Sequence, residues 1–220
     1  MLTVCVSGWR DEELLPDLVA SVKAFGWPIA YVDGAYRLYL DKGEDWHGDV
    51  DAARKALGSW AAFVDAPGDG PWPSEAAKKQ ALMREVLTRR GAGWVLWLDA
   101  DERLESDAHA VDVWPWLLDG DAALLRIWNP SYPHAPEGFT LPRLINLQAG
   151  VEFRPPRDFD LYRGGQRIAW PEMSKEDGAV EVPWSVLRIR HEHRLRSLER
   201  HNRNGVYAQR RKAAHGNAVV

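Results

Sequence analysis

Short apolar runs alternate with segments of helical periodicity over the first hundred residues of the chain. Apolar runs of this length bounded by turn-forming residues are typical of buried strands, whereas apolar residues three or four apart indicate a helix packed on a core. The pattern predicts strands at residues 2–7, 28–33, 60–66 and 94–98, and helices at residues 11–26, 49–57 and 74–90. This alternation predicts an α/β fold with a doubly wound, mostly parallel sheet.

The second half of the chain has a more mixed pattern. A short helix is expected near residues 107–113, strands at 121–129, 139–147 and 185–190, and a long basic helix or arm after residue 191. We found no internal repeat or obvious linker, so one domain is expected over residues 1–220. Its parts are a first half at 1–104, a mixed half at 105–190 and a basic carboxyl-terminal segment at 191–220.

Composition agrees with a single folded domain. The 220 residues are 45% apolar and 27% charged, with a formal net charge of -4, which is typical of a globular protein rather than a disordered or membrane protein. The only cysteine, Cys5, lies in an apolar run, so an intrachain disulfide is excluded and a reducing cytoplasmic location is expected. No apolar run predicts a membrane span, so integral membrane association is not expected.

Basic residues are concentrated near the carboxyl end. Residues 188–212 contain nine Lys or Arg residues against two acids, Glu192 and Glu199. Such a segment is suited to a phosphate group or a nucleic acid, although a solvated basic helix face is the commoner structural explanation.

The stretch WVLWLDADERL, at residues 94–104, follows an apolar strand with Asp99, Asp101 and Glu102. Carboxylates crowded at a strand end repel one another and require solvent or a cation. The spacing of Asp99 and Asp101, together with a diphosphate, would suit Mg²⁺ or Mn²⁺, because these ions prefer oxygen ligands and take few from the protein. Asp33 also ends a predicted parallel strand, where ligands of doubly wound sheets bind, although a turn-initiating Asp before Gly34 is the alternative.

Four segments together resemble a glycosyltransferase of the GT-A fold, similar to the inverting family-two enzymes: VLWLDADE, YVDGAY, AAKKQAL and LRIRHEHR. The resemblance implies that Asp99 contacts the donor ribose, that Asp101 binds the metal and that Asp33 recognises the base. It also implies a late metal-ligand histidine, His191 or alternatively His193. Lys79 and Gln80 stand where the family usually has Arg and Asn. Ser7 and Trp9 stand where the family usually has residues that pack along the nucleoside.

The activity implied by this resemblance is Mn²⁺- or Mg²⁺-dependent transfer of a sugar from a nucleoside diphosphate sugar to an acceptor hydroxyl, with inversion. The acceptor is left open among a protein, a glycan, a small molecule and a modified nucleic acid. Such a transfer requires a general base, for which Asp158, Asp160 and Glu172 are candidates. A surface loop with salt bridges to neighbouring arginines is the alternative explanation of the two aspartates.

Two other functions are compatible with the residues. A nucleotidyltransferase with a related α/β core would bind a nucleoside triphosphate more tightly than a diphosphate sugar and would release pyrophosphate. A non-catalytic nucleic-acid-binding module would instead use the basic segment, and its binding would depend steeply on salt.

Overall fold

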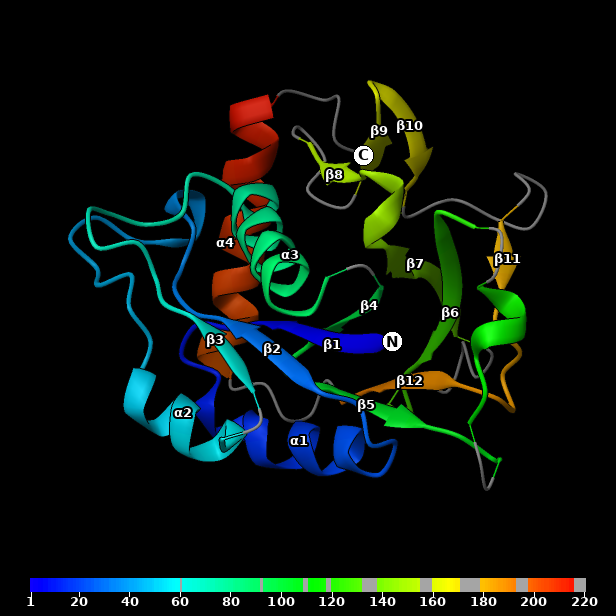
Figure 1. Ribbon diagram of the computed structural model, residues 1–220. Helices are drawn as coiled ribbons and strands as arrows, with labels where there is room; N and C mark the ends of the chain where they lie inside the picture. Colours follow the sequence, from blue (N-terminus) through cyan, green and yellow to red (C-terminus); the bar gives the residue numbers. More distant parts are fainter. Residues whose placement is uncertain are drawn as a thin grey trace.

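The computed structural model describes residues 1–59, 61–91, 93–108, 111–117, 120–131, 138–154, 160–170, 179–192 and 198–215. Within these residues the fold is α/β, built on a mixed nine-stranded sheet whose main path runs β3-β2-β1-β4-β7-β6-β12-β5 (Figure 1).

The first half of the chain forms the parallel part of the sheet. Its strands are β1 (Leu2–Ser7), β2 (Ile29–Val32), β3 (Ala62–Val64) and β4 (Trp94–Asp99). The helices α1 (Leu15–Lys23) and α2 (Val50–Leu57) lie on one face of the sheet, and α3 (Glu75–Arg90) lies on the other (Figure 1). Helices on both faces allow parallel strands to be buried on both sides.

The second half of the chain makes the sheet mixed. Strand β7 (Phe139–Asn146) runs antiparallel to both β4 and β6 (Ala122–Trp128). Strand β12 (Arg188–His191) runs parallel to β6 and antiparallel to β5 (Glu102–Glu105), and β11 (Val180–Glu181) also pairs with β6. This confirms the expected α/β class and the mixed second half.

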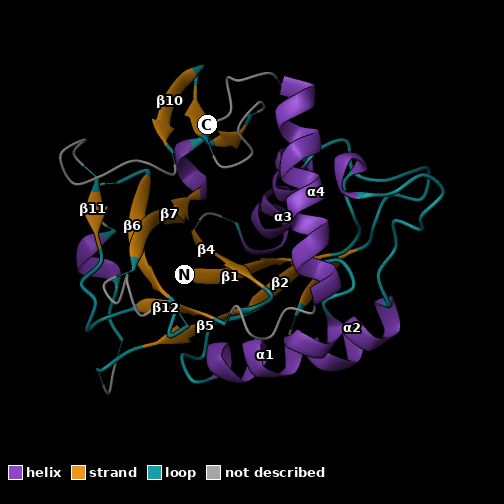
Figure 2. Cartoon of the chain, turned by 180° about the vertical axis from the view of Figure 1, so that it is seen from behind, coloured by secondary structure: helices purple, strands orange, loops and turns teal. Residues whose placement is uncertain are grey.

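The remaining elements lie outside this sheet. Strands β8 (Glu152–Phe153), β9 (Leu161–Arg163) and β10 (Gln166–Ala169) form a small antiparallel sheet. The helix α4 (Leu198–His215) lies on the same side of the main sheet as α3, as Figure 2 shows from behind. Short 3₁₀ helices occur at η1 (Glu12–Leu14), η2 (Arg37–Tyr39), η3 (Trp114–Trp116) and η4 (Leu147–Ala149).

The structure differs from the expectations at the helix near 107–113 and at several strands, β5 and β8 to β11, that were not expected. The helix expected near 107–113 is wrong for the described part of that range, where a 3₁₀ turn begins only at Trp114. The strand β5 was not expected, because its sequence ERLE has no apolar run. It forms because β12 supplies hydrogen bonds on one edge and α1 packs against it.

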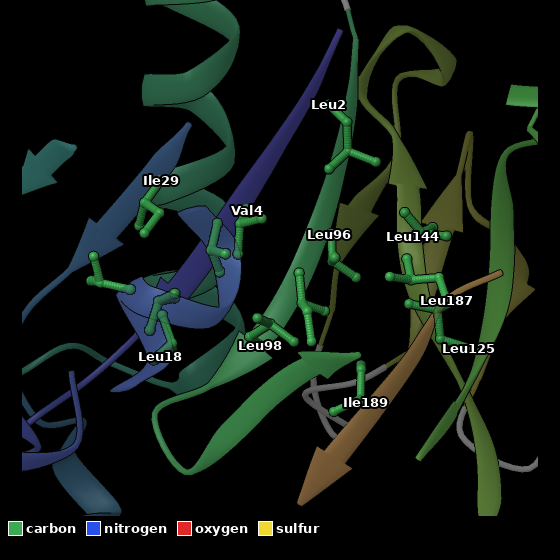
Figure 3. Close-up of a cluster of buried hydrophobic side chains, with 14 of the residues drawn as sticks. Leu2, Val4, Leu18, Ile29, Leu96, Leu98, Leu125, Leu144, Leu187 and Ile189 are labelled. Atoms are coloured by element: carbon green, nitrogen blue, oxygen red, sulfur yellow. The ribbon is translucent and has the colours of Figure 1, made fainter. Parts of the chain in front are cut away.

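The hydrophobic core has one layer on each face of the main sheet. Alternate side chains of β1 enter different layers: Leu2, Val4 and Val6 face α1, whereas Cys5 faces α3. Figure 3 shows the first layer, in which side chains of β1 and β4 gather with Leu18 of α1. Cys5 is fully buried, and burial raises the pKa of its thiol, as expected of a core residue.

Within the described ranges, none of the helices combines the length and the apolarity that crossing a bilayer requires.

Candidate functional site

The carboxyl ends of three neighbouring parallel strands meet at one edge of the sheet. In the strand register, Ser7 at the end of β1 lies between Val32 of β2 and Asp99 of β4. Asp33 follows Val32 directly, and Asp101 follows two residues after Asp99. The ends of parallel strands are where α/β sheets place ligands, so this edge is the candidate site.

Asp101 and His191 meet at this edge, although 90 residues separate them in the chain. Asp101 lies in the tight turn between β4 and β5, and β5 pairs with β12 so that Glu102 lies opposite His191. The imidazole Nε2 of His191 lies 2.8 Å from Oδ2 of Asp101. The main-chain N–H of Glu192 also donates to the carbonyl of Asp101, at 2.8 Å. His193, the alternative ligand, lies outside the described residues.

The pKa of His191 is set by two opposing effects. Burial lowers this pKa, but the hydrogen bond and negative charge of Asp101 outweigh burial, and the net shift of the pKa is upward. The protonated imidazole is therefore stabilised in the folded protein.

We expect the Asp101–His191 pair to stabilise the fold most at low pH. Because the folded-state pKa of His191 lies above its unfolded value, this contribution is fully present below about pH 6.5 and is lost as the pH rises through the folded-state pKa. Urea unfolding of the wild type and of His191→Gln between about pH 5 and pH 9 tests this, since the difference in free energy should shrink as the pH rises. A difference that grew with pH would contradict it.

A second buried pair lies beside the first. Arg143, on β7, donates from Nη2 to Oε1 of Glu102 at 2.7 Å and to Oδ2 of Asp99 at 3.2 Å. Glu102 also accepts a hydrogen bond from the main-chain N–H of Asp99, at 2.8 Å. The side chains of Glu102 and Arg143 are 1% and 8% exposed, whereas that of Asp99 is 41% exposed. Asp99 is therefore the member of this group that a ligand can reach.

The charges of this group depend on one another. Burial raises the pKa of Glu102 to about 7, although the positive charge of Arg143 opposes that shift. Burial disfavours the charged form of Arg143, but Glu102 and Asp99 outweigh it and raise the pKa of Arg143. Sequence reasoning missed Arg143. The available signal was a lone arginine inside the apolar strand sequence LPRLIN.

Two carboxylates and one imidazole lie at this edge, although the side chain of Asp101 is only 1% exposed. Asp99 and Asp101 carry carboxylate oxygens, and His191 would offer an imidazole nitrogen only after losing the proton that Asp101 stabilises. In the part of the chain that the structure describes, no three His, Cys, Asp or Glu side chains are grouped as a complete metal site. Mg²⁺ and Mn²⁺ in nucleotide sites commonly take only one or two protein ligands and complete their shell with phosphates and water, so an Asp–His pair is compatible with that use.

Asp33 and Trp9, two of the expected nucleoside contacts, are covered by neighbouring segments. Asp33 is fully buried, and its Oδ2 accepts a hydrogen bond from the main-chain N–H of Gly48 at 3.0 Å. Trp9 is 7% exposed and donates from its indole to the carbonyl of His47 at 3.1 Å. Ser7, in contrast, is half-buried at the end of β1. The segment around residues 47–48 therefore lies over this end of the sheet.

Lys79 and its neighbour Lys78 are both buried but reach different places. Lys79 pairs with Glu75 at 2.8 Å, and its ammonium lies 5.3 Å from the ring centre of Phe153. Lys78 donates to the carbonyls of Gly8 and Gly34, beyond the ends of β1 and β2, at 2.6 Å and 2.5 Å. Burial lowers the pKa of Lys78 to about 7, against the opposing charge of Asp33. Lys78 is thus the lysine that contacts the candidate edge.

Gln80, next to these lysines, accepts a hydrogen bond from the main-chain N–H of Phe153 at 3.2 Å. It therefore connects α3 to the small sheet.

Two arginines of the basic helix α4 bind acidic residues of this chain. Arg203 lies 2.6 Å from Glu44. Arg210 donates to the carbonyl of Leu40 at 2.7 Å and pairs with Asp41. Arg203 also lies over the ring of Trp9, at 5.0 Å from its centre. These contacts attach α4 to the segment beyond β2 rather than leaving it as a separate arm.

Tyr207 adds an aromatic contact to this attachment, because its ring centre lies 5.0 Å from that of Tyr36 and 5.5 Å from that of Tyr39. We expect Tyr207→Ala to loosen α4, since each aromatic pair contributes about 0.5–1.5 kcal/mol beyond its burial. Hydrogen exchange of residues 198–215 should become faster in this variant. Gln209→Ala, at an exposed position of the same helix, should leave exchange nearly unchanged, and equal effects of both substitutions would contradict the attachment.

Of the general-base candidates, only Asp160 lies within the described residues, and Asp158 and Glu172 lie outside them. Asp160 is 4% exposed and binds Arg167 through both carboxylate oxygens, each at 2.9 Å. Both carboxylate oxygens of Asp160 are therefore occupied by Arg167. Asp160 would have to leave Arg167 in order to accept a proton.

No protein family model matches the chain, and no curated protein matches it in sequence.

Proposed function

We propose that this protein is a metal-dependent glycosyltransferase of the GT-A type, which transfers a sugar from a nucleoside diphosphate sugar to an acceptor hydroxyl with inversion. The observation that carries the proposal is the 2.8 Å contact between Asp101 and His191. These two residues were expected as metal ligands from separate sequence segments, and they lie together at the carboxyl edge of the parallel strands.

The strand order supports the same proposal. Asp99 ends β4, which lies next to β1 in the parallel part of the sheet, and the antiparallel strand β7 follows β4 in the order. In the order β3-β2-β1-β4 the strand order reverses between β1 and β4, so the acidic turn after β4 lies beside the point where ligands of open α/β sheets commonly bind.

Sugar transfer from such a donor requires stabilisation of the departing diphosphate. In this proposal Asp101 and His191 hold Mn²⁺ or Mg²⁺, which supplies Lewis-acid stabilisation of the leaving group when it is bound. Asp99, whose carboxylate is accessible, accepts hydrogen bonds from the donor ribose. Lys78, rather than Lys79, holds the main chain beyond the ends of β1 and β2 by donating to the carbonyls of Gly8 and Gly34.

Calorimetric titration with nucleoside diphosphates tests this function. With Mn²⁺ present, the wild type should bind at least one nucleoside diphosphate and hydrolyse the corresponding nucleotide sugar slowly without an acceptor. Tighter binding of a nucleoside triphosphate, with release of pyrophosphate, would instead favour a nucleotidyltransferase. Absence of nucleotide binding together with salt-sensitive RNA or DNA binding would favour the nucleic-acid-binding alternative.

A further inference from the structure

We propose that Arg143 is a positioning residue that holds the carboxylate of Asp99 in place for the donor ribose. The inference rests on the proposed function and adds to it a residue that the sequence did not indicate. Arg143 does not contact the donor in this proposal; it acts through Asp99.

One atom of Arg143 contacts both Glu102 and Asp99, and this contact supports the inference. Nη2 of Arg143 lies 2.7 Å from Glu102 and 3.2 Å from Asp99, and Glu102 also accepts the main-chain N–H of Asp99 at 2.8 Å. Asp99 is therefore held at its backbone by Glu102 and at its carboxylate by Arg143. Both holding groups come from the sheet itself, from β7 and β5, rather than from loops.

The two side chains that hold Asp99 are buried, whereas Asp99 itself is partly exposed. Glu102 and Arg143 are nearly inaccessible, at 1% and 8% exposure, whereas Asp99 is 41% exposed. An exposed aspartate samples several rotamers. If a ligand requires one of them, its apparent affinity falls with the fraction of the protein that holds that rotamer. A buried charged donor beneath the carboxylate restricts these rotamers before the ligand arrives.

A purely structural role for the Arg143–Glu102 pair predicts a different effect on ligand binding. If Arg143 only neutralised Glu102, removing both charges would leave ligand binding intact once the fold was stable. If Arg143 also holds Asp99, the same double change would weaken ribose recognition in a folded protein. The double variant Arg143→Met/Glu102→Gln separates these roles, because it removes the charges together and avoids a buried unpaired charge.

The experiment compares two ligands by calorimetry with Mn²⁺ present. One ligand is the nucleoside diphosphate that the wild type binds best, and the other is inorganic pyrophosphate, which has no ribose. We expect the double variant to bind the nucleoside diphosphate about ten-fold more weakly, as for a lost hydrogen bond to a charged group, with pyrophosphate binding unchanged. Arg143→Lys alone should lose less of the affinity for the nucleoside diphosphate than the double variant does, since its ammonium can still donate to a carboxylate.

The matched control is Arg126→Met/Glu181→Gln, which removes another Arg–Glu pair of the same sheet, with a contact of 3.1 Å. It should bind both ligands as the wild type does. A folded Arg143→Met/Glu102→Gln protein with wild-type affinity for both ligands, or with equal losses for both, overturns the positioning role alone. Failure of the wild type to bind any nucleoside diphosphate overturns the proposed function, and this inference with it.

Discussion

Replacing Arg143 by methionine is expected to lower the free energy of unfolding by about 3–5 kcal/mol, the usual cost of removing one partner of a buried ion pair. The substitution leaves Glu102, at 1% exposure, without its cationic partner. Without Arg143 the pKa of Glu102, already about 7, should rise further, so Glu102 takes up a proton on folding, which costs free energy at neutral pH. Urea unfolding at neutral pH measures this loss, which should become smaller as the pH falls and Glu102 is protonated more readily.

Two variants define how this result is interpreted. Adding Glu102→Gln to Arg143→Met should recover most of the lost stability, because no unpaired charge remains buried. Arg163→Met serves as the control, since Arg163 pairs with Asp121 but its side chain is 51% exposed, and about 1 kcal/mol or less should be lost. Equal losses for Arg143→Met and Arg163→Met would show that the buried pair has no special role in the fold.

Local sequence patterns predict the parallel half of the fold well because each element there is decided by nearby residues. The sequence LTVCVS is mostly apolar, as a strand covered on both faces requires, and it forms β1. Ser74 caps α3 by accepting the N–H of Ala77, and the helix ends at Gly91, which has the positive φ of 68° that glycine adopts at low cost. These signals lie within a few residues of the structure they predict.

The parts that the sequence did not indicate depend on contacts between distant segments. Strand β5 exists because β12, more than eighty residues later, pairs with it. Arg143 is recognisable as part of the site only when β7 is known to lie beside β4. Similarly, Lys78 and Lys79 are adjacent in sequence, and only the packing of α3 decides which of them reaches the ends of β1 and β2.

The net charge around α4 also depends on contacts with distant segments. Counting charges along residues 188–212 suggests a local cationic segment. In the fold, Arg203 meets Glu44, an acid 159 residues earlier in the chain, and Arg210 meets Asp41. These acids offset the charge that a nucleic acid would have to contact, so a local count overestimates the positive potential at these two positions.

Replacing Asp101 by asparagine is expected to weaken Mn²⁺-dependent binding of a nucleoside diphosphate by at least about 100-fold. The substitution keeps the size of the side chain but removes the charge that would bind the cation. Changes to groups that only support metal ligands already cost about 10–100-fold, so losing a ligand should reach or exceed the upper limit. Calorimetry with and without Mn²⁺ measures the effect, and Asp51→Asn, at an exposed position of α2, should bind as the wild type does.

Spectroscopy separates a metal-binding pair from a hydrogen bond that merely closes the edge of the sheet. If His191 is a ligand, the electron spin-echo signal of bound Mn²⁺ should show coupling to an imidazole nitrogen, and His191→Gln should remove that coupling. Under the proposed function, the Asp101–His191 contact would keep the two groups together before a cation binds, since the imidazole stabilises the carboxylate. Unchanged nucleotide binding in Asp101→Asn, together with no nitrogen coupling in the wild type, would leave this contact as a structural hydrogen bond and contradict the metal-dependent mechanism.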